Sequence, residues 1–253
     1  MQSKPVCSVI IPTLNEEELI KPLVKQLLKS DFICTVIVVD GWSKDRTLTR
    51  ASKAWATVLV SPVPWRAIQM NMGATKAKDE CNVEAKNHYL WFVHADVLLP
   101  KGRDKSIQDA ISDGYTAGCF RSKYDWKSTF LRSTTTNFTK YNHWFFRMGG
   151  QTVRLREKDF FRVWPYDPKK IIAEEIELYH NLYKDETTHF KVLEQEVIVS
   201  ARKHEINGVL YTNIIYAILY VMYWLWVSQD LMVKFYTATI KSDRLASAEE
   251  YWK

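Results

Sequence analysis

The chain has 253 residues, 47% of them hydrophobic, which is enough for one large domain with a substantial core. Its 35 lysine and arginine residues against 29 aspartate and glutamate residues give a formal net charge of +6. This small surplus is spread along the chain, so it suits an anionic small ligand or a phospholipid surface and does not indicate nucleic acid. Neither GxxxxGK followed by Ser or Thr nor GxGxxG occurs, which argues against P-loop nucleotide hydrolases and dinucleotide-dependent dehydrogenases.

The first hundred residues alternate between apolar runs of strand length and segments with a helical period. Strands are predicted at residues 8–13, 36–39, 57–60 and 89–93. Helices are predicted at residues 16–29, in a stretch ending at Ala54, and at residues 65–80, with Asn15 placed to cap the first of them. This alternation predicts an α/β fold with a mostly parallel sheet and helices on both faces.

Beyond Pro100 the pattern is looser. Helices are expected at residues 104–111 and 173–183, an amphipathic segment at 153–161, a strand at 118–124 and an edge strand at 190–200. Residues 126–147 are rich in aromatic, threonine and asparagine residues without a clear period. We expect the part up to Trp144 to contribute to a binding site for a second substrate.

A different pattern begins after Arg202, Lys203 and His204, where residues 209–227 form an apolar stretch dense in tyrosine and tryptophan. We expect a domain from 1 to 204 and a hydrophobic helical appendage from 205 to 253. The stretch is near the lower limit of about 20 residues for a membrane span. Three alternatives stay open: a buried helix docked on the domain, an interfacial helix making peripheral membrane contact, or a single span.

The cysteines are far apart, form no CxxC pair and mostly lie in or beside apolar runs. They are Cys7, Cys34, Cys81 and Cys119. This distribution predicts buried free thiols and a reducing compartment. The polar first five residues lack the apolar core of a signal peptide, so we expect a cytoplasmic protein, at the cytoplasmic face of a membrane if the apolar stretch is interfacial.

Polar residues follow two of the predicted strands, at the sheet edge where open α/β folds bind ligands. Asp40 and Asp96 are strand-end carboxylates suited to Mg²⁺ or Mn²⁺, although a surface aspartate can equally close a turn. Arg66 could pair with a phosphate or simply be a solvated arginine. A cluster of three carboxylates at Glu174, Glu175 and Glu177 could supply a general base or form a solvated acidic face.

Four ordered segments together resemble family-2 glycosyltransferases of the GT-A fold. These segments are SVIIPTLNEE from Ser8, VVDGWSKDRT from Val38, RAIQMNMGA from Arg66 and VHADVLLP from Val93. The closest likeness is to a small bacterial-type subgroup with His-Ala-Asp at the metal position. The resemblance implies a GT-A fold and transfer of a sugar from a nucleotide-diphosphate sugar.

The resemblance also implies roles for individual residues on the donor side. The residues that would contact the donor are Pro12, Thr13, Asn15, Glu16, Asp40, Arg66, Gln69, Asn71 and Ala95. Asp96 would hold a Mn²⁺ or Mg²⁺ cofactor, with His204 as a second candidate ligand. His94 stands at the first position of the family's Asp-x-Asp motif, as in the subgroup.

On the acceptor side the sequence departs from the family pattern. Glu175 occupies the position of the aspartate expected to be the general base, and Gly150 replaces the aspartate of a Gly-Asp-Gln segment. A shift of about 1 Å in a catalytic group can cost on the order of a hundredfold in rate, so these departures could abolish catalysis. Three functions are therefore considered. The first is a metal-dependent, inverting transfer to an acceptor hydroxyl of unknown identity, in a glycan, a lipid or a small molecule. The second is a catalytically degenerate protein that binds a nucleotide or glycan. A third candidate is a membrane-surface adaptor acting through residues 209–227.

Overall fold

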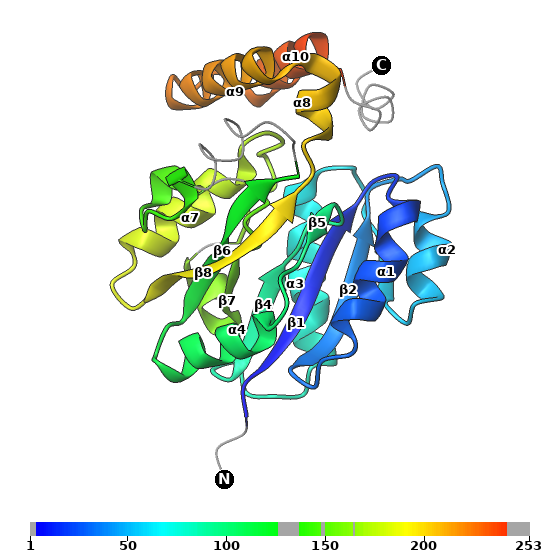
Figure 1. The fold of residues 1–253 in the computed structure, drawn as a ribbon, viewed down its shortest axis with the longest axis vertical. Coiled ribbons are helices and arrows are strands. Elements are labelled where there is room, and N and C mark those ends of the chain that lie inside the picture. Colours follow the sequence, from blue (N-terminus) through cyan, green and yellow to red (C-terminus); the bar gives the residue numbers. More distant parts are fainter. Residues whose placement is uncertain (1–3, 126–136, 148–149, 164, 242–253) are drawn as a thin grey trace.

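A single mixed sheet organises the molecule, as shown by a computed structural model (Figure 1). The structure describes residues 4–125, 137–147, 150–163 and 165–241, so residues 126–136 of the expected acceptor region lie outside the described part. The described strands are β1 Val6–Thr13, β2 Ile33–Asp40, β3 Thr57–Val60, β4 His88–Phe92, β5 Val97–Leu98, β6 Ala117–Tyr124, β7 Arg154–Arg156 and β8 Phe190–Val199. They follow the order β3-β2-β1-β4-β7-β6-β8-β5.

One half of the sheet is a parallel set in the order β3, β2, β1 and β4. The next strand, β7, is antiparallel to both β4 and β6. The chain order reverses at β1, which lies between β2 and β4, and such a switch point opens a crevice beyond the carboxyl ends of the strands. Thr13 pairs with Asp40, so β1 and β2 end level, whereas Ile10 pairs with Phe92, so β4 ends three residues before the end of β1.

Helices cover both faces of the sheet because strand side chains alternate between two apolar cores. The described helices are α1 Glu17–Leu27, α2 Thr47–Ser52, α3 Arg66–Glu80, α4 Arg103–Ser112, the 3₁₀ helix η1 Trp144–Phe146, α6 Glu157–Val163, α7 Glu174–Lys184, α8 Arg202–Asn207, α9 Val209–Trp224 and α10 Gln229–Thr239. Val9 and Ile11 pack in one core with α1, α2 and α4, whereas Ile10 packs in the other with α3, α6 and α7. The α/β class with helices on both faces is therefore confirmed.

The C-terminal helices α8, α9 and α10 lie beyond the carboxyl ends of the strands (Figure 1). They form a small core of their own from Ile215, Leu219, Met232 and Ile240, against which Ile172 packs from the loop before α7. The Gln229 Oε1 accepts hydrogen bonds of 2.9 Å from the backbone N–H groups of Ile171 and Ile172. The expected boundary at residue 205 falls inside α8, and the division into two domains stays a prediction.

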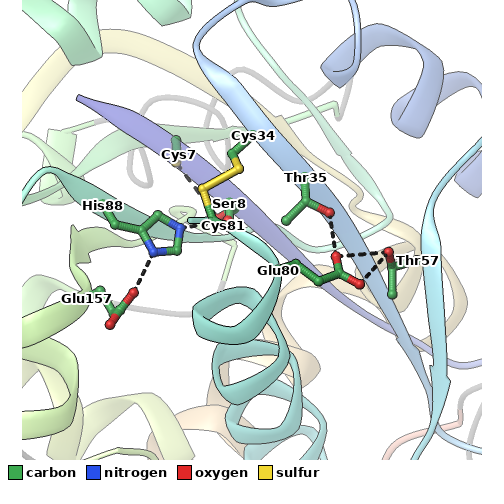
Figure 2. Close-up of a disulfide and its surroundings, with 9 residues drawn as sticks. All are labelled: Cys7, Ser8, Cys34, Thr35, Thr57, Glu80, Cys81, His88 and Glu157. Atoms are coloured by element: carbon green, nitrogen blue, oxygen red, sulfur yellow. Dashed lines mark hydrogen bonds and ion pairs between the residues drawn. A yellow bond between two sulfur atoms is a disulfide. The ribbon is translucent and has the colours of Figure 1, made fainter. Parts of the chain in front are cut away.

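The structure corrects the prediction of four free thiols. Cys34 at the start of β2 and Cys81 after α3 form a disulfide, and only Cys7 and Cys119 are free and buried (Figure 2). Sequence spacing could not reveal this pair, because 47 residues separate two cysteines that the β2–α3 packing brings together. Two thiols in a disulfide also remove the cysteine argument for a reducing compartment, so the cytoplasmic location stays a prediction.

Two further local expectations are wrong. Asn15 does not cap α1: its φ is +53°, and its Oδ1 accepts from the Lys44 backbone N–H at 2.8 Å. The β8 strand is not an edge strand, because it pairs with β6 on one side and with the two-residue β5 on the other. In both cases a contact distant in sequence takes the place of the local one.

The end of the sheet opposite the crevice carries a buried polar chain. Ser8 Oγ lies 2.7 Å from His88 Nε2, and His88 Nδ1 lies 2.5 Å from Glu157 Oε2 (Figure 2). All three residues are buried, so this chain links β1, β4 and α6 and satisfies polar atoms in the core.

Candidate active site

On the donor side of the crevice, uncharged groups surround the Asp40 carboxylate and hydrogen-bond to it. We refer to this set of contacts as the donor frame. Asp40 is fully buried and accepts from Thr13 Oγ1 at 3.1 Å and from the Ser43 backbone N–H at 2.8 Å. Ser43 Oγ also donates to Asp40 and accepts from the Asn15 backbone N–H at 2.8 Å. One carboxylate thereby fixes the ends of β1 and β2 and the turn after β2.

The first turns of α3 complete this frame. Gln69 Nε2 donates to the carbonyl oxygens of Thr13 at 2.9 Å and Val39 at 2.8 Å, so α3 is tied to both strand ends. The Asn71 amide bonds both backbone groups of Tyr166, at 2.6 and 3.0 Å. These two predicted donor-binding residues therefore also support the structure.

Glu16 and Asp96 form the second part of the crevice. Asp96 follows β4, and Glu16 is 5% exposed just after β1. Burial, and secondarily the Asp96 charge, raises the pKa of Glu16 to about 8. The Glu16 and Asp96 carboxylates repel each other, and a cation bound between them would relieve this repulsion.

Arg66 and Glu174 form an ion pair between two helix starts. Arg66 is the first residue of α3 and Glu174 the first of α7, with Nε and Oε1 2.7 Å apart. A carboxylate is favoured at a helix N-terminus and a guanidinium is not, so the pair offsets the unfavourable position of Arg66. Glu174 is almost fully buried, and burial raises its pKa despite the opposing effect of Arg66.

Glu175 differs from its neighbour in being accessible. Its Oε1 lies 3.1 Å from His94 Nε2, and the two side chains are 13% and 15% exposed. Burial acts to raise the pKa of Glu175, but the hydrogen bond and charge of His94, with Arg66, outweigh it and hold the pKa below its usual value. Glu175 is thus ionised at neutral pH and open enough to accept a proton.

The C-terminal helices approach this charged cluster. The Arg66 pKa is raised by Glu174 first and also by Tyr236 on α10 and by Asp96, so these groups lie close together. Lys203 donates to the Tyr236 hydroxyl at 2.7 Å. Burial and the charge of Asp96 raise the pKa of Tyr124 to about 12. The position of Tyr124 and Tyr236 near the charged cluster could not be predicted from the sequence, because their spacing is that of ordinary packing residues.

His204 lies behind Tyr124, with their ring centres 4.7 Å apart, and is 2% exposed. Burial lowers its pKa. Within the described residues, no three His, Cys, Asp or Glu side chains form a group that could hold a metal by themselves. Mg²⁺ commonly takes one or two carboxylates and completes its shell with substrate phosphates and water, so Asp96 beside Glu16 fits such an ion. The role of His204 as a ligand stays a prediction.

The remaining residues predicted for the site are less accessible than Glu175 and Arg66. Pro12 pairs with Val39 inside the sheet, and Ala95 is 5% exposed in the α1-side core. Gly150 has a φ of +90°, and a Cβ there would lie 3.1 Å from two Val199 methyl carbons. An aspartate at this position would therefore be strained, which explains why the glycine suits this backbone.

A surface hollow elsewhere includes only Glu177 of the residues that the sequence singled out. It lies between α6 and α7 and is lined by Arg162, Val163, Glu177, Asn181, Lys184 and Asp185. The structure therefore brings the predicted residues together at the strand ends, with Glu177 turned away from them. His94 and Glu174 are the two polar partners whose roles sequence reasoning missed.

Solved glycosyltransferase structures share this fold. PcManGT, a mannosyltransferase from Pyrobaculum calidifontis solved with GDP-Man and Mn²⁺, matches with a TM-score of 0.57 at 14% identity, over 78% of this chain and 57% of that one. TarS 1–349 of S. aureus with UDP matches with 0.59 at 19%, over 81% and 63%. Glucosyl-3-phosphoglycerate synthase from Mycobacterium tuberculosis, with Mn²⁺, UDP-glucose and phosphoglyceric acid, matches with 0.51 at 15%, over 78% and 70%. This chain thus spans less than two thirds of the first two.

The family follows from the sequence match itself. The family model described as glycosyl transferase family 2 matches residues 8–164, and the chain belongs to this family. The prediction of a family-2 glycosyltransferase is therefore confirmed, whereas the His-Ala-Asp subgroup stays a prediction. No curated protein matches the chain.

Proposed function

We propose that the protein transfers a sugar from a nucleotide-diphosphate sugar to an acceptor hydroxyl, with inversion at the anomeric carbon. The observation that carries the proposal is the Glu175 carboxylate, which is partly exposed and held 3.1 Å from His94 Nε2. Glu175 accepts the acceptor's proton as the hydroxyl oxygen attacks the anomeric carbon. The bond to the nucleoside diphosphate breaks on the opposite side, and direct displacement inverts the centre.

Arg66 is the protein's cation for the departing diphosphate. Its side chain is 48% exposed although its guanidinium is paired with Glu174, so a phosphate can reach it. Asp96, with Glu16 beside it and His204 as a candidate, would hold Mn²⁺ or Mg²⁺. Such an ion would supply Lewis-acid stabilisation of the diphosphate charge. The Mn²⁺ in two of the similar solved structures supports this cofactor.

The donor class is supported by the neighbours named with GDP-Man, UDP-glucose and UDP. The frame around Asp40 would hold the nucleotide, with Thr13, Asn15 and Gln69 fixing its walls. Among the residues that the structure describes, no contact selects one base or one sugar.

The experiment measures purified protein against a panel of nucleotide-diphosphate sugars with and without Mn²⁺, by thermal shift for binding and by nucleotide release for turnover. Specific binding stabilises the folded state by mass action, so a true donor raises the melting temperature. Asp96→Ala should abolish the Mn²⁺-dependent part, while Asp109→Ala on the exposed face of α4 should not. No binding and no turnover with any donor would overturn the proposal.

A second candidate function is a protein that binds the nucleotide without transferring sugar. Glu175 favours this candidate, because its side chain is one methylene longer than the family's aspartate and can move the catalytic carboxylate out of position. Nucleotide binding with no turnover against any acceptor, unchanged by Glu175→Asp, would establish this candidate over the first.

A further inference from the structure

Helix α9 is apolar on all sides, but the fold covers only one of them. The segment Val209–Trp224 contains no charged residue, and only Thr212, Ile215 and Leu219 are buried. A helix that is hydrophobic all round is ordinarily buried on every side. The uncovered side of α9 therefore calls for a partner.

The uncovered side forms a continuous stripe. Its aliphatic members recur every three or four residues, which places them on one helix face. They are Leu210, Ile214, Ile218, Val221 and Leu225, with exposed fractions of 74%, 48%, 39%, 55% and 71%. We refer to these five residues as the α9 stripe. Apolar surface this continuous commonly marks a protein or membrane contact.

Aromatic residues stand at both ends of the α9 stripe. Tyr211 at one end is 46% exposed, and Trp224 and Trp226 at the other are 41% and 86% exposed. Tyrosine and tryptophan favour the depth of lipid headgroups, where an apolar ring and a polar tip are both satisfied. Their placement fits a helix lying flat in the interface.

The charge around α9 is complementary to anionic lipid. Residues 202–241 contain four lysine or arginine residues, against only Glu205 and Asp230 as acids. Lys170 adds a cation from the neighbouring loop, with its Nζ 5.0 Å from the Tyr223 ring centre. Basic residues near a membrane surface strengthen binding to anionic lipid.

The stripe suits hydrocarbon better than another protein. Its five side chains are all aliphatic, and the exposed residue Asn213 lies on the same helix, whereas protein interfaces carry about one hydrogen bond per 100–200 Å². None of the helices within the described residues is long and apolar enough to cross a membrane. We propose that the α9 stripe docks the protein on an anionic phospholipid bilayer, with α9 parallel to the surface.

This docking would place the candidate active site at the bilayer. Helices α8 to α10 lie at the end of the molecule where β1 and β4 deliver their polar residues (Figure 1). Tyr216, on α9 itself, has its pKa raised by burial and influenced by Arg66, so the helix also borders the charged cluster. The docking surface does not depend on the proposed sugar transfer.

The test is flotation of the full-length protein with phosphatidylcholine vesicles, with and without phosphatidylserine. The wild type should float with the mixed vesicles, and high salt should weaken this. Leu210→Glu with Val221→Glu should lower the partition coefficient at least tenfold. Leu19→Glu with Leu28→Glu, a pair of exposed leucines on α1, is the matched control and should leave it unchanged.

Thermal denaturation and nucleotide binding of both double variants separate this inference from the proposed function. Unchanged melting and nucleotide binding with lost flotation would support the docking surface. A wild type that never floats, or flotation insensitive to the α9 changes, would overturn it. A dimer in solution that the same α9 changes dissociate would assign the stripe to a second copy of the chain and also overturn it.

Discussion

The two sides of the candidate active site are built from different interactions. On the donor side, Asp40, Thr13 and Gln69 are buried and satisfied by neutral groups of the strand ends. On the acceptor side and at its border with the donor side, His94 with Glu175 and Arg66 with Glu174 are charged pairs between separate helices and loops. The donor side is thus part of the folded core, whereas the acceptor side is held by charges that the core does not require.

This difference predicts different outcomes for mutations on the two sides. Changes in the donor frame should lower the free energy of unfolding, because each leaves buried polar groups without a partner. Changes to the accessible acceptor-side residues should lower the rate with little effect on stability.

The largest effect is expected for Glu175→Gln, which keeps the side-chain shape but removes the base. General base catalysis contributes about 10² to 10⁴ in rate, so we expect a loss of about 10³-fold in kcat. The measurement is initial rate with the donor found by thermal shift. Glu177→Gln, which changes the next carboxylate of α7, is the matched control. A rate within tenfold of the wild type would remove Glu175 from this role.

The next effect concerns the disulfide between β2 and α3, which joins these two elements at the end opposite the donor frame. Cross-linking Cys34 to Cys81 restricts the unfolded chain, so reduction should lower the free energy of unfolding by about 2 to 4 kcal/mol. Denaturant unfolding with and without reductant measures this, and the Cys34→Ser, Cys81→Ser double variant should match the reduced protein. If the double variant still responds to reductant, the effect comes from elsewhere.

Asp40→Ala tests whether the donor frame is structural. The change leaves the Thr13 hydroxyl and the Ser43 backbone N–H without their acceptor, so we expect a loss of about 1 to 3 kcal/mol in stability. Urea unfolding gives this value, and Asp31→Ala in the exposed turn before β2 serves for comparison. Weakened nucleotide binding with unchanged stability would show that Asp40 acts on the ligand alone.

A double-mutant cycle on Arg66 and Glu174 addresses the border between the two sides. Arg66→Ala alone leaves a buried carboxylate uncompensated, and Glu174→Gln alone leaves a half-exposed guanidinium that water can solvate. Because Arg66 is partly screened by solvent, the coupling should be about 1 kcal/mol, below that of a fully buried pair. Additive effects of the two changes would show that the pair contributes nothing.

The sequence predicted the donor side better than the acceptor side for a physical reason. Strand-end residues such as Thr13 and Asp40 have positions set by local runs of apolar residues and by parallel register. The partners of Arg66 and Glu175 lie 108 and 81 residues away, respectively, and are chosen by how α7 packs against the sheet. The same holds for the disulfide and for the tyrosines of the C-terminal helices, which no local period could reveal.

The smallest expected effect is a shift in pH dependence caused by His94→Gln. His94 holds the pKa of Glu175 below its ordinary value. The ionised carboxylate and the stability from its contact with His94 are therefore fully present at pH values above the ordinary pKa. Both are lost as the pH falls through the lowered pKa. Removing the imidazole should raise the Glu175 pKa. A hydrogen bond to a charged group is worth about 1.5 to 3 kcal/mol, which corresponds to about one to two pH units. The acid limb of kcat should therefore move to higher pH by about one to two units, with the rate near neutrality almost unchanged. An unmoved acid limb would mean that burial and Arg66 alone set the charge of Glu175, and the two sides of the site would then differ less than their contacts indicate.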